Sequence, residues 1–468
     1  MQYIKEVIPT VNAPTFKGGI HPDAHKELTC HKPIQVMPVP DVLYLPLSMH
    51  WNRPCDPVVK PGDRVLIGQV IADSADPIPV PIHSPVSGTV KKIEQHESVS
   101  SGKKPMIVIE NDHLDEFHPS VQPLPNWREK TPEELIDFVR AKGMVGMGGA
   151  AFPTHFKLKS VLGKIDTLIV NAAECEPYLT CDHRVLLEHY DTLLLGIQVI
   201  MHILGQKRAY LAFEENKKDC EAGLHKYMRD NNIRGIETVI LHNKYPQGYE
   251  KQLVKVVTGR EIPSRGLPGD VGCAIFNTQT MSAIGEAINT GLPLVQRIVT
   301  VTGDAIAKPT NLEVRLGTPL AAVIEAAGGF SKDPRIIICG GPMMGSLQYS
   351  LDAVIVKATN GVIAMHEVEP RPKHAPVCIR CGRCVAACPM RLEPIYMNMY
   401  ANARDYEGLE RYHIRDCMEC GSCAYICPAR IPLVENFRIA KAHLPKAPPP
   451  PPAKEKKEKK GGSLFGRK

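Results

Sequence analysis

Eight of the fifteen cysteines fall into two copies of one spacing, and this repeat limits what the chain can fold into more than any other feature. In each copy, two residues separate each of the first three cysteines, three residues precede the fourth, and a proline follows it. The first copy spans residues 378–389 and the second spans residues 417–428. Three thiols this close together need one tight loop, whereas the start of a helix carries the fourth away from it. The fourth cysteine of each copy is therefore expected to complete a site centred on the other copy.

The repeated spacing matches that of bacterial ferredoxin domains with two [4Fe–4S] clusters. The two expected ligand sets are Cys378, Cys381, Cys384 with Cys427, and Cys417, Cys420, Cys423 with Cys388. Structural zinc is the alternative, because paired cysteines at this spacing also bind zinc. A zinc site uses four ligands, however, and has no need of a third cysteine or of the repeated Cys-Pro. We therefore predict two clusters that transfer single electrons.

Composition suggests a soluble chain in a reducing compartment. A length of 468 residues corresponds to about three domains. No signal peptide is expected at the N-terminus, and the longest apolar run, residues 193–204, is too short to span a bilayer and is expected to be a buried helix. Residues 445–468 hold eight basic and two acidic residues, 8 − 2 = +6, which equals the net charge of the whole chain. The remainder is neutral, which argues against a nucleic-acid-binding body. The proline- and lysine-rich tail is expected to be disordered, and it either contacts anionic lipid or stays solvated.

Short β-type runs broken by turns follow an N-terminal segment that contains the sequence F-K-G-G-I-H-P at residues 16–22. Residues 58–71 and 84–90 form two such half-motifs, and they resemble the two halves of lipoyl and biotinyl carrier domains. Those domains carry their cofactor on a lysine between the halves. Here that position has Asp76-Pro77, and neither side chain offers an amine. The resemblance therefore implies the barrel without a swinging arm.

A glycine-rich loop at residues 143–154 precedes a helix and a buried parallel-type strand at residues 166–170. The strand ends in N-A-A-E-C-E-P, and a second strand, residues 209–213, ends in Glu214 and Glu215. Ligands of open α/β sheets bind at the carboxyl ends of the strands, so the acidic segments and the glycine loop should converge on one crevice. A flexible loop that binds nothing remains the alternative for the glycines.

The glycine loop and the N-A-x-E-x-E-P segment resemble the flavin- and NADH-binding subunit of respiratory complex I. That resemblance implies FMN contacts from Gly146, Gly148, Gly149, Lys157, Asn171, Glu174, Asn277 and Thr280. It also implies a nicotinamide-nucleotide pocket lined by Phe152, Glu176, Glu214 and Glu215. The chain departs from that family at Ala173, where an aspartate is usual, and at Ser160, where a second aromatic residue is usual. No residue is expected to act as a proton-transfer catalyst.

The order of modules resembles the C subunits of the Rnf (Rsx) electron transport complexes over nearly the whole chain. The expected domains are an N-terminal segment (1–54), a barrel-sandwich hybrid (55–125), a Rossmann-like FMN/NADH domain (126–290), a β-grasp or SLBB domain (291–365), an α-helical ferredoxin-type domain (366–444) and the tail (445–468). Two short helices are expected between the cysteine copies. The fold class is thus multidomain α/β.

The resemblance implies an NADH-linked oxidoreductase subunit with FMN, NAD(H) and two [4Fe–4S] clusters. It would be a peripheral subunit on the cytoplasmic side of a bacterial inner membrane. Its partners would be subunits of the A, B, D, E and G types in a six-subunit ion-translocating complex, with ferredoxin reached indirectly. Two other functions remain open. One is a soluble flavin and iron–sulfur corrinoid (cobalamin) reductase, and the other is an electron-transfer scaffold without flavin activity.

Overall fold

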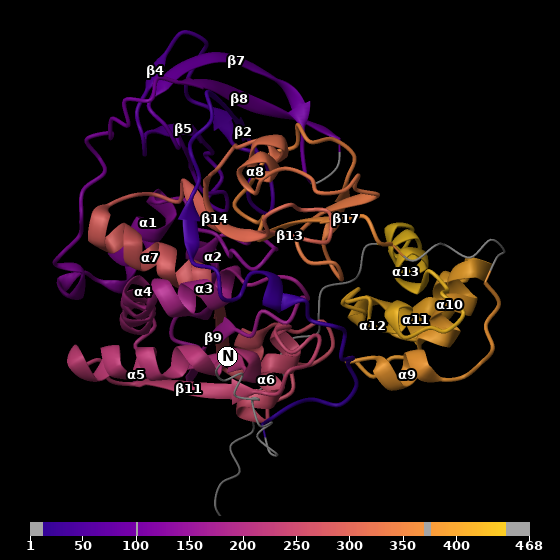
Figure 1. The fold of residues 1–468 in the computed structure, drawn as a ribbon. Helices are drawn as coiled ribbons and strands as arrows, with labels where there is room; N and C mark the ends of the chain where they lie inside the picture. Colours follow the sequence, from indigo (N-terminus) through magenta and orange to yellow (C-terminus); the bar gives the residue numbers. More distant parts are fainter. Residues whose placement is uncertain (1–12, 100–101, 369–375, 446–468) are drawn as a thin grey trace, which may run out of the picture.

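The computed structural model describes residues 13–99, 102–368 and 376–445. The predicted disordered tail therefore lies outside the described residues, apart from Pro445. Figure 1 shows the β strands of the barrel at one end of the body, an α/β layer at the other and the β-grasp strands between them. The helices that carry the cysteine motifs form a lobe beside this body. The predicted multidomain α/β architecture is confirmed.

The barrel is a sandwich of two small antiparallel sheets. One sheet has the order β2-β8-β7-β4, with bounds Val42–Pro46, Lys103–Asn111, Gly88–Glu97 and Arg64–Val65. The other has the order β3-β5-β6, with bounds Asp56–Pro57, Val70–Asp73 and Ile82–His83. Apolar side chains from both sheets, among them Leu43, Ile71 and Ile107, are fully buried between them. Asp76-Pro77 lies between β5 and β6, where no lysine is available for a tethered cofactor.

The α/β body has a parallel sheet of order β11-β10-β9-β12, with bounds Ile236–Leu241, Ala209–Glu214, Thr167–Ala172 and Cys273–Asn277. The strand order reverses between β9 and β12, so a crevice opens at the carboxyl ends of these two strands. Asn171 on β9 is in register with Asn277 on β12. The sheet thus brings two candidate FMN residues to its switch point.

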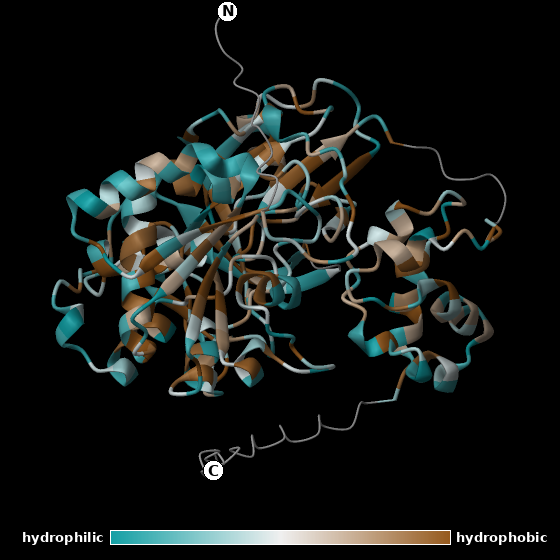
Figure 2. Cartoon of the chain, turned by 90° about the horizontal axis from the view of Figure 1, so that it is seen from below, coloured by the Kyte–Doolittle hydropathy of each residue, from teal (hydrophilic) through white to brown (hydrophobic). Residues whose placement is uncertain are grey.

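Helices cover both faces of this sheet. Their bounds are α1 Pro132–Ala141, α2 Thr154–Val161, α3 Cys181–Glu188, α4 Tyr190–Ile203, α5 Glu221–Asp230, α6 Glu250–Thr258 and α7 Thr278–Thr290. The long apolar run forms α4, as expected, and packs on α7. Figure 2 shows the apolar colour concentrated in the central strands, with hydrophilic residues on many outer helices. Within the described residues, no helix combines the length and the apolar character that crossing a membrane requires.

The β-grasp region forms a six-stranded sheet of order β1-β14-β13-β17-β15-β16. Its strands are Ile34–Val36, Thr310–Arg315, Gln296–Thr302, Gly361–Met365, Ile336–Cys339 and Ser346–Gln348, and α8, Leu320–Ala326, packs on them. The edge strand β1 and the barrel strand β2 both come from the first 54 residues. The N-terminal segment is therefore divided between two neighbouring sheets.

The cysteine lobe consists of short helices around a small apolar core. Their bounds are α9 Arg383–Ala387, α10 Pro394–Ala403, α11 Tyr406–Arg411, α12 Ser422–Tyr425 and α13 Leu433–Ala442. The prediction of two short helices between the cysteine copies is confirmed by α10 and α11. Met397, Leu409 and Phe437 are fully buried at the centre of the lobe. This core holds the two cysteine loops at a fixed separation.

Candidate functional site

The glycine loop is fastened over the carboxyl end of β12. The amide of Met147 donates to Thr280 Oγ1 at 2.9 Å, and the amide of Gly146 donates to the carbonyl of Phe152 at 2.8 Å. Thr280 belongs to the first turn of α7, so one hydroxyl links the loop to the helix that follows β12. At Gly149 the backbone has a φ of +114°, and a Cβ added there would meet nothing within 4 Å. The loop therefore leaves open space where its backbone amides can approach a ligand.

Asn171 and Asn277 line the switch point beneath this loop. Asn277 Oδ1 accepts from the amides of Gln279 and Thr280 and so caps α7. Its Nδ2 donates to Asp182 at 2.8 Å, while Asn171 Nδ2 donates to the carbonyl of Gly248 at 2.7 Å. The structure thus gathers six of the predicted FMN residues at one place: Gly146, Gly148, Gly149, Asn171, Asn277 and Thr280.

Lys157 supplies a half-buried cation next to this group. Its Nζ lies 5.2 Å from the centre of the Phe276 ring, and within the described part of the chain it forms no ion pair. Burial lowers the pKa of this amine, and the negative charge of Glu250 opposes that effect. A cation without a partner ion in a half-buried position is suited to an anionic ligand group. The remaining aromatic candidate, Phe152, is half-buried at the outer end of the loop.

Glu174 caps the first turn of helix α3 with its carboxylate. Its two carboxylate oxygens accept from the amides of Asp182 and His183 at 2.7 and 3.2 Å. Asp182 also accepts from Gln279 Nε2 at 3.0 Å, and burial together with Glu174 raises the pKa of Asp182 to about 6. The carboxylate of Glu174 is thus engaged in a network beneath the crevice. Its predicted contact with FMN stays a prediction.

Glu214 and Glu215 lie together at the carboxyl end of β10, one strand away from the switch point. Glu214 is 2% exposed, and burial raises its pKa, which Lys217 and Lys26 oppose. Lys217 Nζ lies 3.7 Å from Glu214, and His242 Nδ1 lies 3.1 Å from Glu215. Both carboxylates already have protein partners. Their assignment to a nucleotide pocket also stays a prediction.

Glu176 faces the cysteine lobe. Its Oε2 accepts from the amide of Met343 at 3.0 Å, and its carboxylate is hydrogen-bonded to Tyr245. Burial raises the pKa of Glu176 to about 7. The Tyr245 hydroxyl in turn donates to the carbonyl of Cys420 at 2.8 Å. A short polar path therefore runs from the acidic loop of the α/β body to the second cysteine motif.

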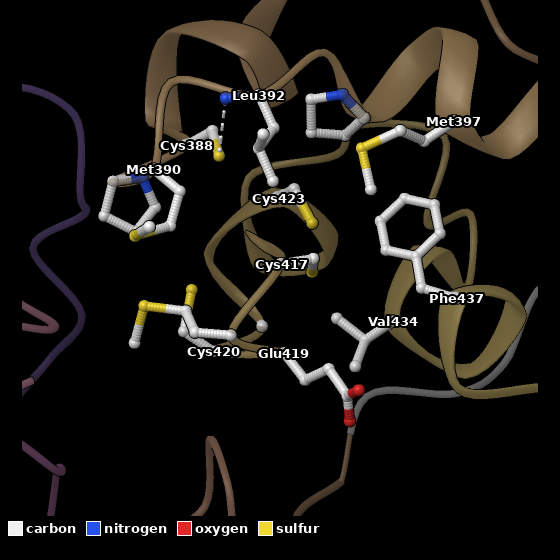
Figure 3. A pocket seen from close by; sticks show the side chains of 14 residues that line it. Cys388, Met390, Leu392, Met397, Cys417, Glu419, Cys420, Cys423, Val434 and Phe437 are labelled. Atoms are coloured by element: carbon white, nitrogen blue, oxygen red, sulfur yellow. Dashed lines mark hydrogen bonds between the residues drawn. The ribbon is translucent and has the colours of Figure 1, made fainter. Parts of the chain in front are cut away.

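Three cysteines of the second motif and the last cysteine of the first motif line one cavity. Figure 3 shows Cys417, Cys420 and Cys423 lining one cavity together with Cys388, and apolar side chains that include Met397, Val434 and Phe437 form its wall. The amide of Leu392 donates to Cys388 Sγ at 3.3 Å. Burial raises the pKa of Cys417 to about 11, so iron would have to displace protons from these thiols.

The first cysteine motif has the complementary arrangement. Cys378, Cys381 and Cys384 line a second cavity with Cys427, and Ile395, Asn398 and Met399 of α10 border it. Cys378 and Cys381 are exposed, whereas Cys388, Cys420 and Cys423 of the other cavity are buried. The two predicted ligand sets thus correspond to two separate cavities, each with four thiols. Four thiols around one apolar cavity suit a cubane cluster, and the described cysteines form no disulfide.

Two residues of this region had no sequence signal. Lys26 is buried, and its ammonium donates to the carbonyls of Glu174, Glu176 and Leu179, which fixes the shape of the acidic loop. Tyr245 follows β11 and connects Glu176 to Cys420. Both side chains form hydrogen bonds to segments that are far away in the sequence. Neither residue belongs to a motif that the sequence singles out.

Family models match four regions of the chain. The model described as the RnfC barrel sandwich hybrid domain matches residues 14–114, and the Nuo51 FMN-binding domain matches residues 139–286. The SLBB domain matches residues 298–346, and a 4Fe-4S dicluster domain matches residues 373–428. A solved structure of an NAD+-reducing [NiFe]-hydrogenase in the H2-reduced state shares the fold, with a TM-score of 0.50 and 18% identity over 70% of this chain and 66% of that chain.

Several known proteins are similar to the chain over most of its length. The C subunit of a proton-translocating ferredoxin:NAD(+) oxidoreductase complex from Clostridium ljungdahlii is 42% identical over 86% of this chain and 88% of its own length. The C subunit of the Na(+)-translocating complex from Acetobacterium woodii is 40% identical over 92% of this chain and 97% of its own length. The C subunit of an ion-translocating oxidoreductase complex from Rhodobacter capsulatus is 42% identical over 92% of this chain and 83% of its own length. The chain therefore belongs to the family of the C subunits of ion-translocating oxidoreductase complexes.

Proposed function

We propose that this chain is the NADH-linked subunit of an ion-translocating electron transport complex and passes electrons between NADH, FMN and two [4Fe–4S] clusters. The related subunits belong to complexes named ferredoxin:NAD(+) oxidoreductases, which supports this assignment. The observation that carries it is the pair of four-thiol cavities beside a body whose FMN-binding family model covers the glycine loop. A bound flavin accepts two electrons together and releases them singly, which a hydride donor and one-electron clusters require.

The glycine loop and the two asparagines would hold the flavin. Gly146, Gly148 and Gly149 have no side chains to keep a ligand away from the backbone, and Lys157 would bind an anionic group of the ligand. Asn171 and Asn277 would hold polar atoms of the ligand from the strand ends below. Phe152 would cover the outer side, where NADH has to approach. The acids Glu174, Glu176, Glu214 and Glu215 would shape the nucleotide site through the loops that they stabilise.

The positions of the two cavities suggest an order of electron transfer. The motif around the second cavity is bound to the α/β body through Tyr245 and Cys420, and Asp416 accepts from Ser264 Oγ at 2.6 Å. By contrast, Cys378 and Cys381 of the first cavity are exposed. Electrons from NADH would therefore reach the cluster of Cys388, Cys417, Cys420 and Cys423 first. They would leave through the cluster of Cys378, Cys381, Cys384 and Cys427.

The partners would be the membrane subunits of such a complex, of the A, B, D, E and G types, with ferredoxin reached through them. We place the chain on the cytoplasmic side of a bacterial inner membrane as a peripheral subunit, because NADH and ferredoxin are cytoplasmic electron carriers. The exposed face at Cys378 and Cys381 would be where the next electron carrier docks.

Anaerobic reconstitution with iron, sulfide and FMN tests the proposal. We expect about eight iron atoms per chain, retained FMN, and bleaching of the flavin and then of the clusters after NADH is added. Cys423→Ser should leave flavin bleaching intact but slow the reduction of the remaining cluster, whereas Cys381→Ser should leave the reduction of the second cluster fast. A protein that binds iron but no flavin would contradict the proposal. Rapid NADH-dependent reduction of cob(III)alamin without association with membrane subunits would instead indicate a corrinoid reductase.

A further inference from the structure

An exposed tryptophan stands beside the candidate nucleotide site. Trp51 is 56% exposed, although tryptophan side chains are usually well covered. It comes from the segment between β2 and β3, which lies outside the region that the FMN-binding family model covers. The ring of Trp51 lies 5.5 Å from the ring of Phe152, with a tilt of 37° between the planes. Two large rings from different modules thus meet at the outer end of the glycine loop.

Buried neighbours and a backbone hydrogen bond hold Trp51 in this position. Its amide donates to the carbonyl of Ala151 at 3.0 Å, directly before Phe152. On one side, Met49 and His50 are buried, and His50 Nε2 is 3.0 Å from the carbonyl of Arg53. The turn is therefore anchored at both ends while the indole faces solvent. An indole that is exposed but held in place is preorganised, so it can stack on a flat ligand without a large loss of side-chain entropy.

We propose that Trp51 stacks on the adenine ring of the nicotinamide nucleotide, as a second aromatic contact next to Phe152. This inference rests on the proposed function and deepens it. The nicotinamide end would lie next to the flavin that the glycine loop would hold, since hydride transfer requires contact between the two rings. The adenine end then extends outward, and Trp51 is the more exposed of the two rings. Helix α2 contributes Phe156, whose ring lies 6.0 Å from that of Phe152, and Trp51 is the ring that the barrel module adds beside Phe152.

Tryptophan fluorescence gives a direct test, because the chain has only two tryptophans. Trp127 is buried, and Arg128 lies 4.2 Å above its ring. In a Trp127→Phe background, Trp51 is the only source of tryptophan emission. We expect ADP-ribose, which carries the adenine but no nicotinamide, to quench its emission saturably in the FMN-loaded protein. NMN, which carries the nicotinamide but no adenine, should leave the emission nearly unchanged.

Steady-state kinetics give an independent measurement. Trp51→Ala should raise the KM for NADH roughly tenfold to a hundredfold, since one stacked base contributes this much to binding, while kcat changes little. Trp51→Phe should recover most of the affinity. Tyr349→Ala serves as the matched control, because Tyr349 is also an aromatic side chain, 95% exposed, and has no ring contact among the described residues. Its removal should leave the KM unchanged.

Two results would overturn the inference while leaving the proposed function intact. One is a normal KM in Trp51→Ala with no quenching by ADP-ribose, although NADH still bleaches the flavin. The other is quenching by NMN but not by ADP-ribose, which would place the nicotinamide at Trp51. Failure of NADH to bleach the flavin of the wild-type protein would count against the proposed function, and the ADP-ribose titration would still decide the role of Trp51.

Discussion

Gly18 lies where the N-terminal segment packs directly on the first cysteine motif. Its φ is +83°, and a Cβ added there would lie 2.5 Å from the carbonyl oxygen of Cys388. The next residue, Gly19, donates its amide to the carbonyl of Ala387 at 2.8 Å. Cys388 is the cysteine that completes the second cavity. Gly18→Ala should therefore disturb the contact between the body and the cluster that we place first in the electron path.

The size of the effect follows from two contributions. An alanine in the left-handed region costs about 1–2 kcal/mol. Ordinary contact begins near 3.4 Å, so the carbonyl would have to move by 3.4 − 2.5, about 0.9 Å. Forced overpacking of this kind costs typically ~1–3 kcal/mol. Gly163→Ala is the matched control, because Gly163 also has a positive φ, +70°, but open space around its Cβ position. Gly18→Ala should therefore destabilise the protein more than Gly163→Ala does, and the difference should equal the overpacking contribution alone.

Two measurements check this prediction in the anaerobically reconstituted protein. Urea unfolding, followed by the visible absorbance of the clusters, should show Gly18→Ala to be about 1–3 kcal/mol less stable than Gly163→Ala. Stopped-flow mixing with NADH should show slower cluster reduction, because the docked form would be roughly fivefold to more than a hundredfold less favoured. If the two variants match in both stability and rate, the close packing at Cys388 does not support electron transfer and the reasoning fails.

Three further perturbations test other parts of the structure. Cys427→Ser should remove only the first cluster and Cys388→Ser only the second, so that each retains about four iron atoms with a different EPR signal; loss of the cluster of the same motif would contradict the crossed ligand sets. Tyr245→Phe should lower the midpoint potential of the second cluster by at most roughly 40 mV, because it removes one hydrogen bond of about 1 kcal/mol to the Cys420 carbonyl and the potential shifts only by the part of this energy that differs between the two cluster charges; a redox titration with an unchanged midpoint would show that this hydrogen bond does not tune the cluster. Burial and the nearby Glu313 raise the pKa of Glu286 from 4.5 to about 7, so its contribution to stability is present below pH 4.5 and is lost as the pH rises through 7. Between pH 5 and 8, the unfolding free energy of the wild-type protein should therefore fall by up to about 3 kcal/mol relative to that of Glu286→Gln. If urea unfolding gives the same difference in free energy between the two proteins at every pH in this range, the prediction is wrong.

The parts of the site that sequence reasoning located depend on local rules. The crossed cavities follow from the spacing of the cysteines, because three residues before the fourth cysteine are enough for a helix to turn it away. The meeting of Asn171 and Asn277 follows from the parallel sheet, in which strand ends share one edge. The glycine loop then has one place to fold, above those ends.

The contacts of the acidic side chains could not be predicted from the sequence. Glu174 and Glu176 are two residues apart, yet one caps α3 and the other contacts the cysteine lobe. Glu174 has a φ of +46°, and this left-handed residue sends the following side chains in a new direction. No pattern in the sequence marks a non-glycine residue for that conformation. The loop at Met343 also meets Glu176 only through long-range folding.

Lys26 has a consequence for how the chain can be divided. One ammonium from the N-terminal segment satisfies three carbonyls of a loop about 150 residues later, much as a bound metal ion would, but with a covalent tether. A fragment that begins at the expected domain boundary near residue 126 would carry the glycine loop, the strands and both asparagines and still lack this charge. The candidate nucleotide site therefore depends on more than the flavin module. Excised modules and chimaeras of this family should include the N-terminal segment if their acidic loop is to keep its shape.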